Sequence, residues 1–172
     1  AGIVIVAVVV IQAVDQGWWQ PSTESLARVV AIDAATWQPD AAVYAIDDAV
    51  AAGDVLSLAR GFIELSYADG TAVVLEGPAS FEIRAATDGR LTRGRLTATL
   101  GSTSKGFTVR TPSAVITDLG TQFGVEVDTG GRTDVRVFQG LVELAAVASL
   151  GAVAPARLAA GNAAEVDDAG RI

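Results

Sequence analysis

The chain has 172 residues, of which 51% are apolar but only 6% aromatic, so its core must consist mainly of Ala, Val, Leu and Ile. Its 20 acidic residues outnumber 12 scattered basic ones, which disfavours a nucleic-acid partner because such binding requires clustered neutralisation of phosphates. Cysteine and histidine are absent, which excludes disulfides, thiolate metal sites and histidine-based catalysis. Methionine is absent too, and we expect the chain to be a piece of a longer product.

The first segment, residues 1–14, is apolar except for Gln12. A helix that spans a bilayer requires about 20 apolar residues, so preceding residues would have to complete such a span. Trp18 and Trp19 follow, and tryptophan favours the membrane–water interface. We predict that residues 1–17 are the C-terminal part of a single transmembrane helix and that residues 18–25 are a linker. A buried strand and a cleaved signal peptide are the alternatives for the apolar run.

Residues 26–172 are expected to form one β domain, although the pattern of its first part is ambiguous. Residues 21–24 (Pro-Ser-Thr-Glu) could cap a short helix, whereas residues 26–32 equally suit a strand. From Gly61 onward apolar residues alternate with polar ones, and this alternation predicts strands.

An Asp-Gly turn at residues 69–70 is expected to join the next two strands, because Asp-Gly between alternating runs favours a two-residue type I′ turn. A loop of two residues would place Leu65 opposite Val74 and Tyr67 opposite Ala72. The sequence therefore predicts a tight hairpin with this register.

Two more turns are expected before residue 100. Gly77-Pro78 should close the first hairpin, because proline cannot donate a hydrogen bond to a strand ladder. Asp88-Gly89 should be a second Asp-Gly turn, between a strand at residues 80–84 and another at residues 91–100. Gly94 interrupts the latter strand and predicts a bulge or a sharp bend.

Residues 106–125 contain two short alternating runs. Thr111-Pro112 separates the two runs, and Asp118-Leu119-Gly120-Thr121 follows the second. Proline breaks the strand ladder and glycine supplies the backbone angles of a bend, so this stretch predicts strands separated by corners.

The hairpin that follows can be given a register from parity. The valines on its two strands share one face only if paired residue numbers sum to an even value. The simplest solution pairs Val125 with Val135 and leaves residues 129–131 (Thr-Gly-Gly) as a three-residue loop with glycine in the left-handed position. Asp128 then faces Arg132, as a surface ion pair worth about 0.5 kcal/mol.

The residues indicate no catalytic, cofactor-binding or metal site, and we expect a domain that is not an enzyme and needs no cofactor. Glu64 and Glu143 lie in matching Gly-apolar-apolar-Glu-Leu segments and could form a carboxylate pair. Strand geometry instead favours a solvated position for each glutamate. Residues 104–105 (Ser-Lys) are adjacent and therefore do not suit a serine–lysine nucleophile.

Two acidic segments are candidate cation sites. Residues 128–134 resemble a calcium loop faintly, but they lack its ligand spacing and contain an arginine, so the hairpin is the better interpretation. Glu165, Asp167 and Asp168 could hold a cation weakly, but they are expected to form a solvated acidic end of the chain.

The order and spacing of the motifs resemble those of the FecR domain, over roughly residues 26–172 and most densely over residues 53–144. The motif residues, which we expect to determine the fold, are Gly61, Gly77, Pro78, Gly94, Thr111, Pro112, Asp118, Leu119, Gly120, Thr121, Phe123, Gly124 and Gly140. The segments 75–79 (Leu-Glu-Gly-Pro-Ala) and 118–121 (Asp-Leu-Gly-Thr) look most like the versions found in planctomycete-type bacteria.

The resemblance implies an all-β, jelly-roll-like antiparallel β-sandwich preceded by the end of a single transmembrane helix. Members of the family are typically single-pass regulators of the cytoplasmic (inner) membrane. Their cytoplasmic segment controls an extracytoplasmic-function sigma factor, and their β domain lies in the periplasm as a receiver. The implied partners are thus a periplasmic or envelope protein, a sigma factor bound through a cytoplasmic segment outside this sequence, and the membrane.

An iron-citrate role is not implied, because the part that engages an outer-membrane transducer in iron-regulating members is not identifiable in this sequence. The alternative function is that of an envelope adhesion or glycan-binding scaffold module. A downstream lectin-like domain would favour this alternative, and a preceding cytoplasmic helical segment would favour the regulator.

Overall fold

The computed structural model describes residues 24–149 and 154–172, which form a domain built from strands. The strands within these residues, in chain order, are β1 (Ser25–Trp37), β2 (Ala49–Ala51), β3 (Val55–Tyr67), β4 (Ala72–Ala85), β5 (Asp88–Thr99), β6 (Phe107–Arg110), β7 (Ala114–Asp118), β8 (Gln122–Val127), β9 (Thr133–Gln139), β10 (Leu141–Ala146), β11 (Ala156–Ala159) and β12 (Ala163–Val166). One short 3₁₀ turn, η1 (Val147–Ser149), follows β10. The prediction of an all-β domain is confirmed.

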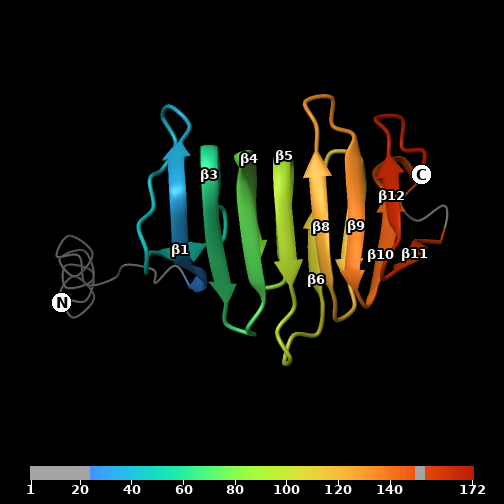
Figure 1. Cartoon of the computed structure of the whole chain (residues 1–172), viewed down its shortest axis with the longest axis horizontal. Helices are drawn as coiled ribbons and strands as arrows, with labels where there is room; N and C mark the ends of the chain where they lie inside the picture. The colour runs from blue at the N-terminus through green and yellow to red at the C-terminus, as the bar shows by residue number, and fades with distance from the viewer. Residues whose placement is uncertain (1–23, 150–153) are drawn as a thin grey trace, which may run out of the picture.

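The strands form a single 12-stranded sheet that branches at β5. One branch continues through β6, β7, β10 and β11, and the other continues through β8, β9 and β12. The branching is possible because the start of β5 (residues 88–90) pairs with β6, while residues 94–99 pair with β8. Figure 1 shows β3, β4, β5, β8 and β9 side by side, with β6 partly hidden behind β8.

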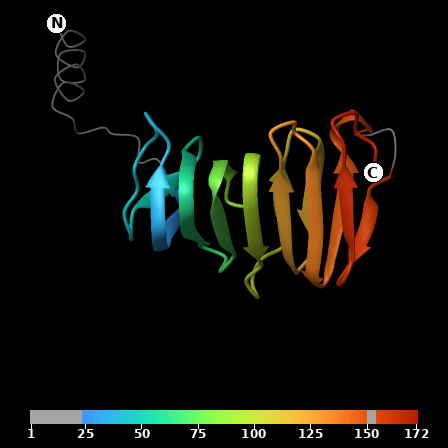
Figure 2. The ribbon, with the colours of Figure 1, turned by 45° about the horizontal axis from the view of Figure 1, so that its top comes forward.

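The pairing is antiparallel throughout the described strands except between β5 and β6, which are parallel. The expected antiparallel pairing is therefore confirmed for the other strand pairs. The jelly-roll connectivity that the family resemblance implies stays a prediction. Figure 2 shows the molecule turned by 45° from Figure 1. On the side of β5 that holds the yellow to red strands, the strands of the two branches lie one behind the other.

One hydrophobic core extends from β1, β3 and β4 into both branches. Phe107 and Ile116 from the first branch and Phe123 and Val135 from the second are fully buried in the same cluster. Strand alternation accounts for this burial, because every second side chain of β8 points inward. The few aromatic residues and the many valines and leucines thus form the core that the composition predicts.

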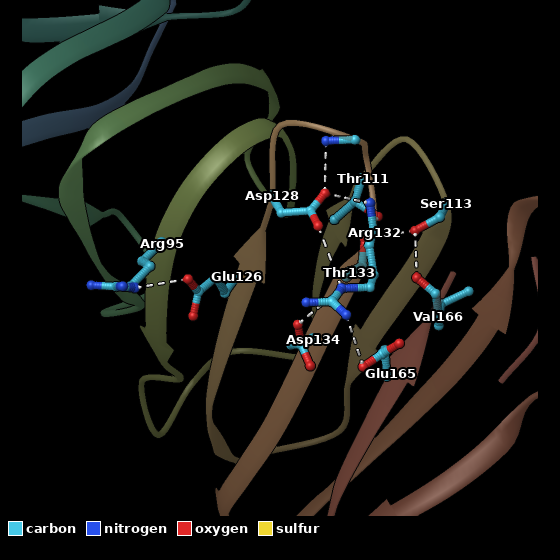
Figure 3. A network of polar contacts seen from close by, with 11 residues as sticks. Arg95, Thr111, Ser113, Glu126, Asp128, Arg132, Thr133, Asp134, Glu165 and Val166 are labelled. Carbon is cyan, nitrogen blue, oxygen red and sulfur yellow. Dashed lines mark hydrogen bonds and ion pairs between the residues drawn. The ribbon is translucent and has the colours of Figure 1, made fainter. Parts of the chain in front are cut away.

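Buried hydroxyl groups join the branches at one end of the core. The Thr133 hydroxyl of β9 lies 2.7 Å from the hydroxyl of Thr111 and 2.8 Å from that of Ser113. Ser113, at the corner between β6 and β7, also donates to the Val166 carbonyl of β12 over 3.2 Å. Figure 3 shows these contacts crossing from one branch to the other. Since buried hydroxyls require partners, this network specifies how the branches meet.

A line of irregular pairing, which we call the crease, crosses four neighbouring strands. The register of β1 against β3 shifts between Asp33 and Thr36, and that of β3 against β4 shifts between Leu58 and Phe62. The register of β4 against β5 shifts between Glu76 and Ser80. β-Bulges of this kind bend a strand and increase its twist. The crease therefore bends the long strands β1, β3, β4 and β5 at one level of the sheet.

Two glycines show how closely the backbones approach in the crease. A Cβ atom added at Gly61, whose φ is +81°, would lie 2.4 Å from the Ala34 carbonyl oxygen of β1. A Cβ atom added at Gly94, whose φ is +99°, would lie 2.3 Å from the Pro78 carbonyl oxygen of β4. Both the contact and the positive φ require glycine at these positions. The bend predicted at Gly94 is confirmed.

The parity argument for the β8–β9 hairpin is confirmed. Val125 pairs with Val135, and the backbone of Asp128 pairs with that of Arg132 across a three-residue loop. Gly131 occupies the left-handed position with a φ of +88°. The strand, corner, strand prediction for residues 106–125 is also confirmed, with β6 and β7 on either side of Thr111-Pro112.

The predicted register of the β3–β4 hairpin is wrong by one residue. Leu65 pairs with Val73, and the Tyr67 amide donates to the Thr71 carbonyl over 2.9 Å. The loop therefore contains three residues, 68–70, instead of the Asp-Gly pair alone. Leu65 and Val73 are both fully buried, and an even sum of residue numbers is needed to place both on the core face.

The two other predicted turns of this region are also wrong. Asp88 and Gly89 belong to β5, and the turn lies at residues 86–87. Gly89 is required inside the strand because a Cβ atom there would lie 2.2 Å from the ring of the buried Phe81. Gly77-Pro78 does not end a strand but lies within β4, at the crease.

At the start of the domain, the ambiguous segment 26–32 is part of the 13-residue strand β1. The predicted transmembrane segment 1–17 lies outside the described residues, as does the predicted linker 18–25 apart from its last two residues. Over residues 24–149 and 154–172, no helix has the length and apolar character that a membrane crossing requires.

Candidate functional site

The motif residues gather in two places. Gly61, Gly77, Pro78 and Gly94 all lie in the crease, on three neighbouring strands. A Cβ atom at Gly77 would lie 2.7 Å from the Arg60 backbone, so β3 and β4 are also in close contact there. The spacing of these four residues in the sequence thus corresponds to one structural feature, the bend of the sheet.

The second group of motif residues lies at the turn between β7 and β8, where residues 118–121 (Asp-Leu-Gly-Thr) contact Gly140. The Gly120 amide and the Thr121 hydroxyl both donate to Oδ1 of Asp118, the former over 3.0 Å. A Cβ atom at Gly140 would lie 2.5 Å from the Thr121 side chain and 2.9 Å from the Gly120 carbonyl oxygen. The turn between β9 and β10 therefore packs directly on the turn between β7 and β8.

Asp118 is fully buried, and its Oδ2 atom has no hydrogen-bond partner among the described residues. Burial raises the pKa of this carboxyl above its ordinary value, although hydrogen bonds from Thr121 and from the backbone of residues 119–121 oppose the rise. Because the folded pKa is raised, the contribution of Asp118 to stability is full below its unfolded pKa and is lost as the pH rises through the folded pKa.

We therefore expect Asp118→Asn to gain stability relative to the wild type as the pH rises from about 4 to 7. Asparagine keeps the oxygen that accepts from Gly120 and Thr121, and it removes the buried negative charge. Urea denaturation of both proteins at the two pH values measures the change. A difference in stability between the two proteins that is equal at both pH values would contradict it.

The other motif residues support the core and the outer face. Thr111 belongs to the buried hydroxyl network, and Pro112 packs against the β8–β9 loop, where a Cβ atom at Gly131 would lie 3.3 Å from it. Phe123 is fully buried in the core. The next residue, Gly124, lies under the ring of Phe138, since a Cβ atom there would be 3.3 Å from that ring.

Near these residues the surface has a depression that we call the front groove. It has a volume of 410 Å³ on the outer face of β3, β4, β5, β8 and β9, and is lined chiefly by Phe62, Val74, Glu76, Arg95, Glu126 and Phe138. Phe62 is 43% exposed and Phe138 is 55% exposed, which is high for phenylalanine. Two partly exposed aromatic rings beside charged groups are typical of a binding surface.

Arg95 lines the front groove and lies between two carboxylates. Its Nη1 donates to Glu76 over 2.8 Å, and its Nε lies 3.2 Å from Glu126, as Figure 3 shows for the latter pair. The hydrogen bond and charge of Glu126, followed by the charge of Glu76, raise the pKa of Arg95. These pairs hold Arg95 across β4, β5 and β8, so the groove has a fixed charged bridge.

The front groove continues past Arg95 into a second depression of 410 Å³. Glu76, Arg95 and Glu126 line both parts. The second part is also lined by the motif residues Gly77, Pro78 and Gly94. The crease that bends the sheet is thus one wall of the front groove, which links the motif to a surface.

The two acidic segments have structural roles. Arg132 lies between three carboxylates, 3.4 Å from Asp128, 3.9 Å from Asp134 and 3.5 Å from Glu165 (Figure 3). Its guanidinium supplies the positive charge in the segment that resembles a calcium loop, and it joins the β8–β9 loop to β12. Among residues 24–149 and 154–172, no group of three potential ligands is arranged to hold a metal ion.

The two glutamates of the repeated Gly-apolar-apolar-Glu-Leu pattern are not brought together as a pair. Glu64 lies on β3, and Glu143 lies on β10 in the other part of the branched sheet, where it bonds Arg157 at 3.0 Å. Sequence reasoning missed the front groove, although one signal was available. Parity places Phe138 on the face opposite Val135 and Val137, and a large apolar residue on an outer face indicates a contact surface.

Comparisons with known proteins agree with this architecture. Two crystal structures of a protein assigned as an anti-sigma factor from Parabacteroides distasonis ATCC 8503 are similar in fold, with TM-scores of 0.55 and 0.54 and sequence identities of 19% and 20%. Each match covers 66% of this chain and 55% of the other, so this chain spans just over half the length of those proteins. A search of curated proteins found no match.

The family comparison is more specific than the structural one. The model of the FecR protein family matches residues 54–143, from the start of β3 to β10. This range is more than half of the chain and contains the crease in β3, β4 and β5, the β7–β8 turn and every motif residue discussed above. The chain belongs to the FecR protein family.

Proposed function

We propose that this chain is the extracytoplasmic receiver domain of a single-pass membrane regulator that controls an extracytoplasmic-function sigma factor. The observation that carries the proposal is the FecR match over residues 54–143. The similarity in fold to a protein assigned as an anti-sigma factor supports it. In this role the domain acts by binding and not by catalysis, and it needs no cofactor.

The proposal includes the position of the domain in the cell. In this proposal residues 1–17, which include the apolar run 1–14, are the C-terminal part of the transmembrane helix, and residues 26–172 lie in the periplasm with a jelly-roll arrangement of strands. A sigma factor binds a cytoplasmic segment of the parent protein beyond this sequence. Signalling then requires that the periplasmic domain receive an input that the membrane helix transmits.

The front groove is the input surface in this proposal. Phe62 and Phe138 present apolar area that a protein partner can bury, and aromatic residues contribute most of the binding energy in many interfaces. The Glu76–Arg95–Glu126 bridge supplies polar groups of both charges between the two parts of the groove. The partner is accordingly a protein of the periplasm or envelope.

The same surface supports a second candidate function, an envelope adhesion or glycan-binding scaffold module. Exposed phenylalanine rings can stack on the apolar face of a sugar, and Arg95, Glu76 and Glu126 could bond its hydroxyls. The two candidates differ in the partner that the groove binds and in whether a sigma factor is attached.

Cross-linking in the native membrane tests the proposal. The full-length parent protein is cross-linked with a membrane-permeable reagent and purified, and the attached proteins are identified by mass spectrometry. Recovery of a sigma factor together with an envelope protein is the expected result. Recovery of envelope material without a sigma factor would overturn the regulator and favour the scaffold.

A second arm locates the input surface. A photoreactive amino acid replaces Phe138 in one variant and Val43, which is 73% exposed and outside the front groove, in the matched control. The envelope partner should be captured from position 138 and not from position 43. Equal capture from both positions would exclude the front groove as the specific input surface.

A further inference from the structure

A second groove, which we call the arginine groove, differs from the front groove in charge. It has a volume of 480 Å³ and is lined by Arg84, Arg90, Arg110, Pro112, Val115 and Val147, among others. These residues come from β4, β5, β6, β7 and the turns beside them. The lining contains no carboxylate, in a protein whose net charge is −8.

The carboxylate of Asp88 contacts two of the arginines, Arg110 and Arg84. Its Oδ2 accepts a hydrogen bond of 2.8 Å from Nε of Arg110, and its Oδ1 lies 3.9 Å from Nε of Arg84. Both contacts use Nε, and in the part of the chain that the structure describes neither arginine donates a hydrogen bond from a terminal nitrogen to another side chain. A guanidinium presents five donors in a fixed plane, so both groups keep donors for a further carboxylate.

Arg90 is in a less favourable electrostatic environment than Arg84 and Arg110. It lies directly opposite Arg110 in the parallel pairing of β5 with β6, and like charges that face each other destabilise a sheet. Glu82 is its register partner in β4, but no ion pair joins Glu82 to Arg90 in the described residues. A carboxylate placed between Arg90 and Arg110 would relieve this repulsion.

The arginine groove also has an apolar side. Val147 is 41% exposed, and Val115 and Pro112 lie beside it in the lining. A simple anion would leave this apolar surface uncovered, whereas a peptide can supply a carboxylate and an apolar side chain together. The combination of three guanidinium groups with valine and proline is complementary to an acidic peptide that also carries aliphatic residues.

We propose that the arginine groove binds an acidic, valine- or leucine-containing peptide segment of a partner protein. A carboxylate of the segment lies between Arg90 and Arg110, and an aliphatic side chain covers Val115 and Val147. The site is distinct in its residues from the front groove and does not depend on control of a sigma factor. It gives the domain a second protein contact, selected by charge.

Fluorescence polarisation with a defined probe tests the site. The full 172-residue chain in neutral detergent micelles is titrated against a fluorescein-labelled peptide of about ten residues that contains glutamate and valine. The expected result is saturable binding that weakens by about tenfold or more when glutamine replaces every glutamate, because charge-assisted bonds to arginine are lost. High salt should weaken binding in the same direction.

Variants of the chain locate the contact. Arg90→Gln should weaken binding by about tenfold and leave the melting temperature nearly unchanged, since Arg90 makes no ion pair among the described residues. Arg110→Lys keeps the charge but loses the planar fork, and should cause a smaller loss. Arg157→Gln is the matched control, because Arg157 is an exposed arginine on β11 outside the groove.

Three results would overturn the proposal. The first is undiminished peptide binding by Arg90→Gln, and the second is equal binding of the glutamate and glutamine peptides. The third is binding of the anionic polysaccharide heparin at this groove with no binding of the peptide, which would assign the groove to a glycan. Loss of binding in Arg90→Gln with the control intact supports the acidic-peptide site.

Discussion

Gly94→Ala is expected to lower the free energy of unfolding by about 4 kcal/mol, which is large for the addition of one methyl group. Two effects combine at this position. The φ of +99° is unfavourable for any residue with a Cβ atom, and the new atom would lie 2.3 Å from the Pro78 carbonyl oxygen and 2.6 Å from Cα of Ala79. Both of these atoms belong to the backbone of β4, so the strands of the crease would have to separate.

Gly120→Ala is the matched control for this prediction. Gly120 has a similar φ of +110°, but no atom lies within 4 Å of an added Cβ atom. Only the backbone strain remains, and the expected loss is about 1–2 kcal/mol. Urea denaturation of the two variants and the wild type measures both values. Equal losses would show that the close approach of β4 and β5 contributes nothing.

The second large effect concerns Phe81 of β4 and Gly89 of β5, which are diagonal neighbours in the strand pairing, with the Phe81 ring lying against Gly89. Phe81→Ala should cost about 3–5 kcal/mol, because the ring is fully buried in the core and its removal leaves a cavity. Gly89→Ala should cost about 2 kcal/mol by overpacking, since the added Cβ atom would lie 2.2 Å from the Phe81 ring.

The double variant Phe81→Ala/Gly89→Ala tests the contact itself. Once the ring is absent, the methyl group added at position 89 enters space that the ring occupied, so its cost should fall close to zero or become a gain. The two substitutions would then be strongly non-additive, as expected for residues in direct contact. Additive costs in a denaturation experiment would contradict the proposed reason for glycine at position 89.

The position of the motif residues suggests why a fold-determining motif can also serve binding. Gly77, Pro78 and Gly94 bend the sheet at the crease, and the same residues line the second part of the front groove. The shape of the groove therefore depends on the bend. Variants at the crease that still fold should change partner binding as well as stability.

Several features of this protein follow from the sequence alone. Alternation of apolar and polar residues identified the strands after Gly61, and parity identified the register of the β8–β9 hairpin, with Val125 opposite Val135. The motif identified the family, which the match over residues 54–143 shows. These successes share a physical basis, because side-chain alternation and short loops depend on residues that are close in the chain.

The same local rules failed where packing decided between alternatives. Asp69-Gly70 and Asp88-Gly89 have the same turn-forming sequence, yet one lies in a three-residue loop and the other lies within β5. In the first case the burial of Leu65 and Val73 determines the register. In the second, Gly89 provides space for the ring of Phe81 from the neighbouring strand. Neither cause is visible in the residues near the turn.

The sequence by itself thus determined the β class of the domain, the family and the register of one hairpin. Only the tertiary structure decided the branching of the sheet at β5, the alignment of Gly61, Gly77 and Gly94 into one crease, and the two grooves. Each of these features depends on contacts between residues far apart in the chain. Such contacts are selected by the joint packing of all strands around the core, which no local pattern specifies.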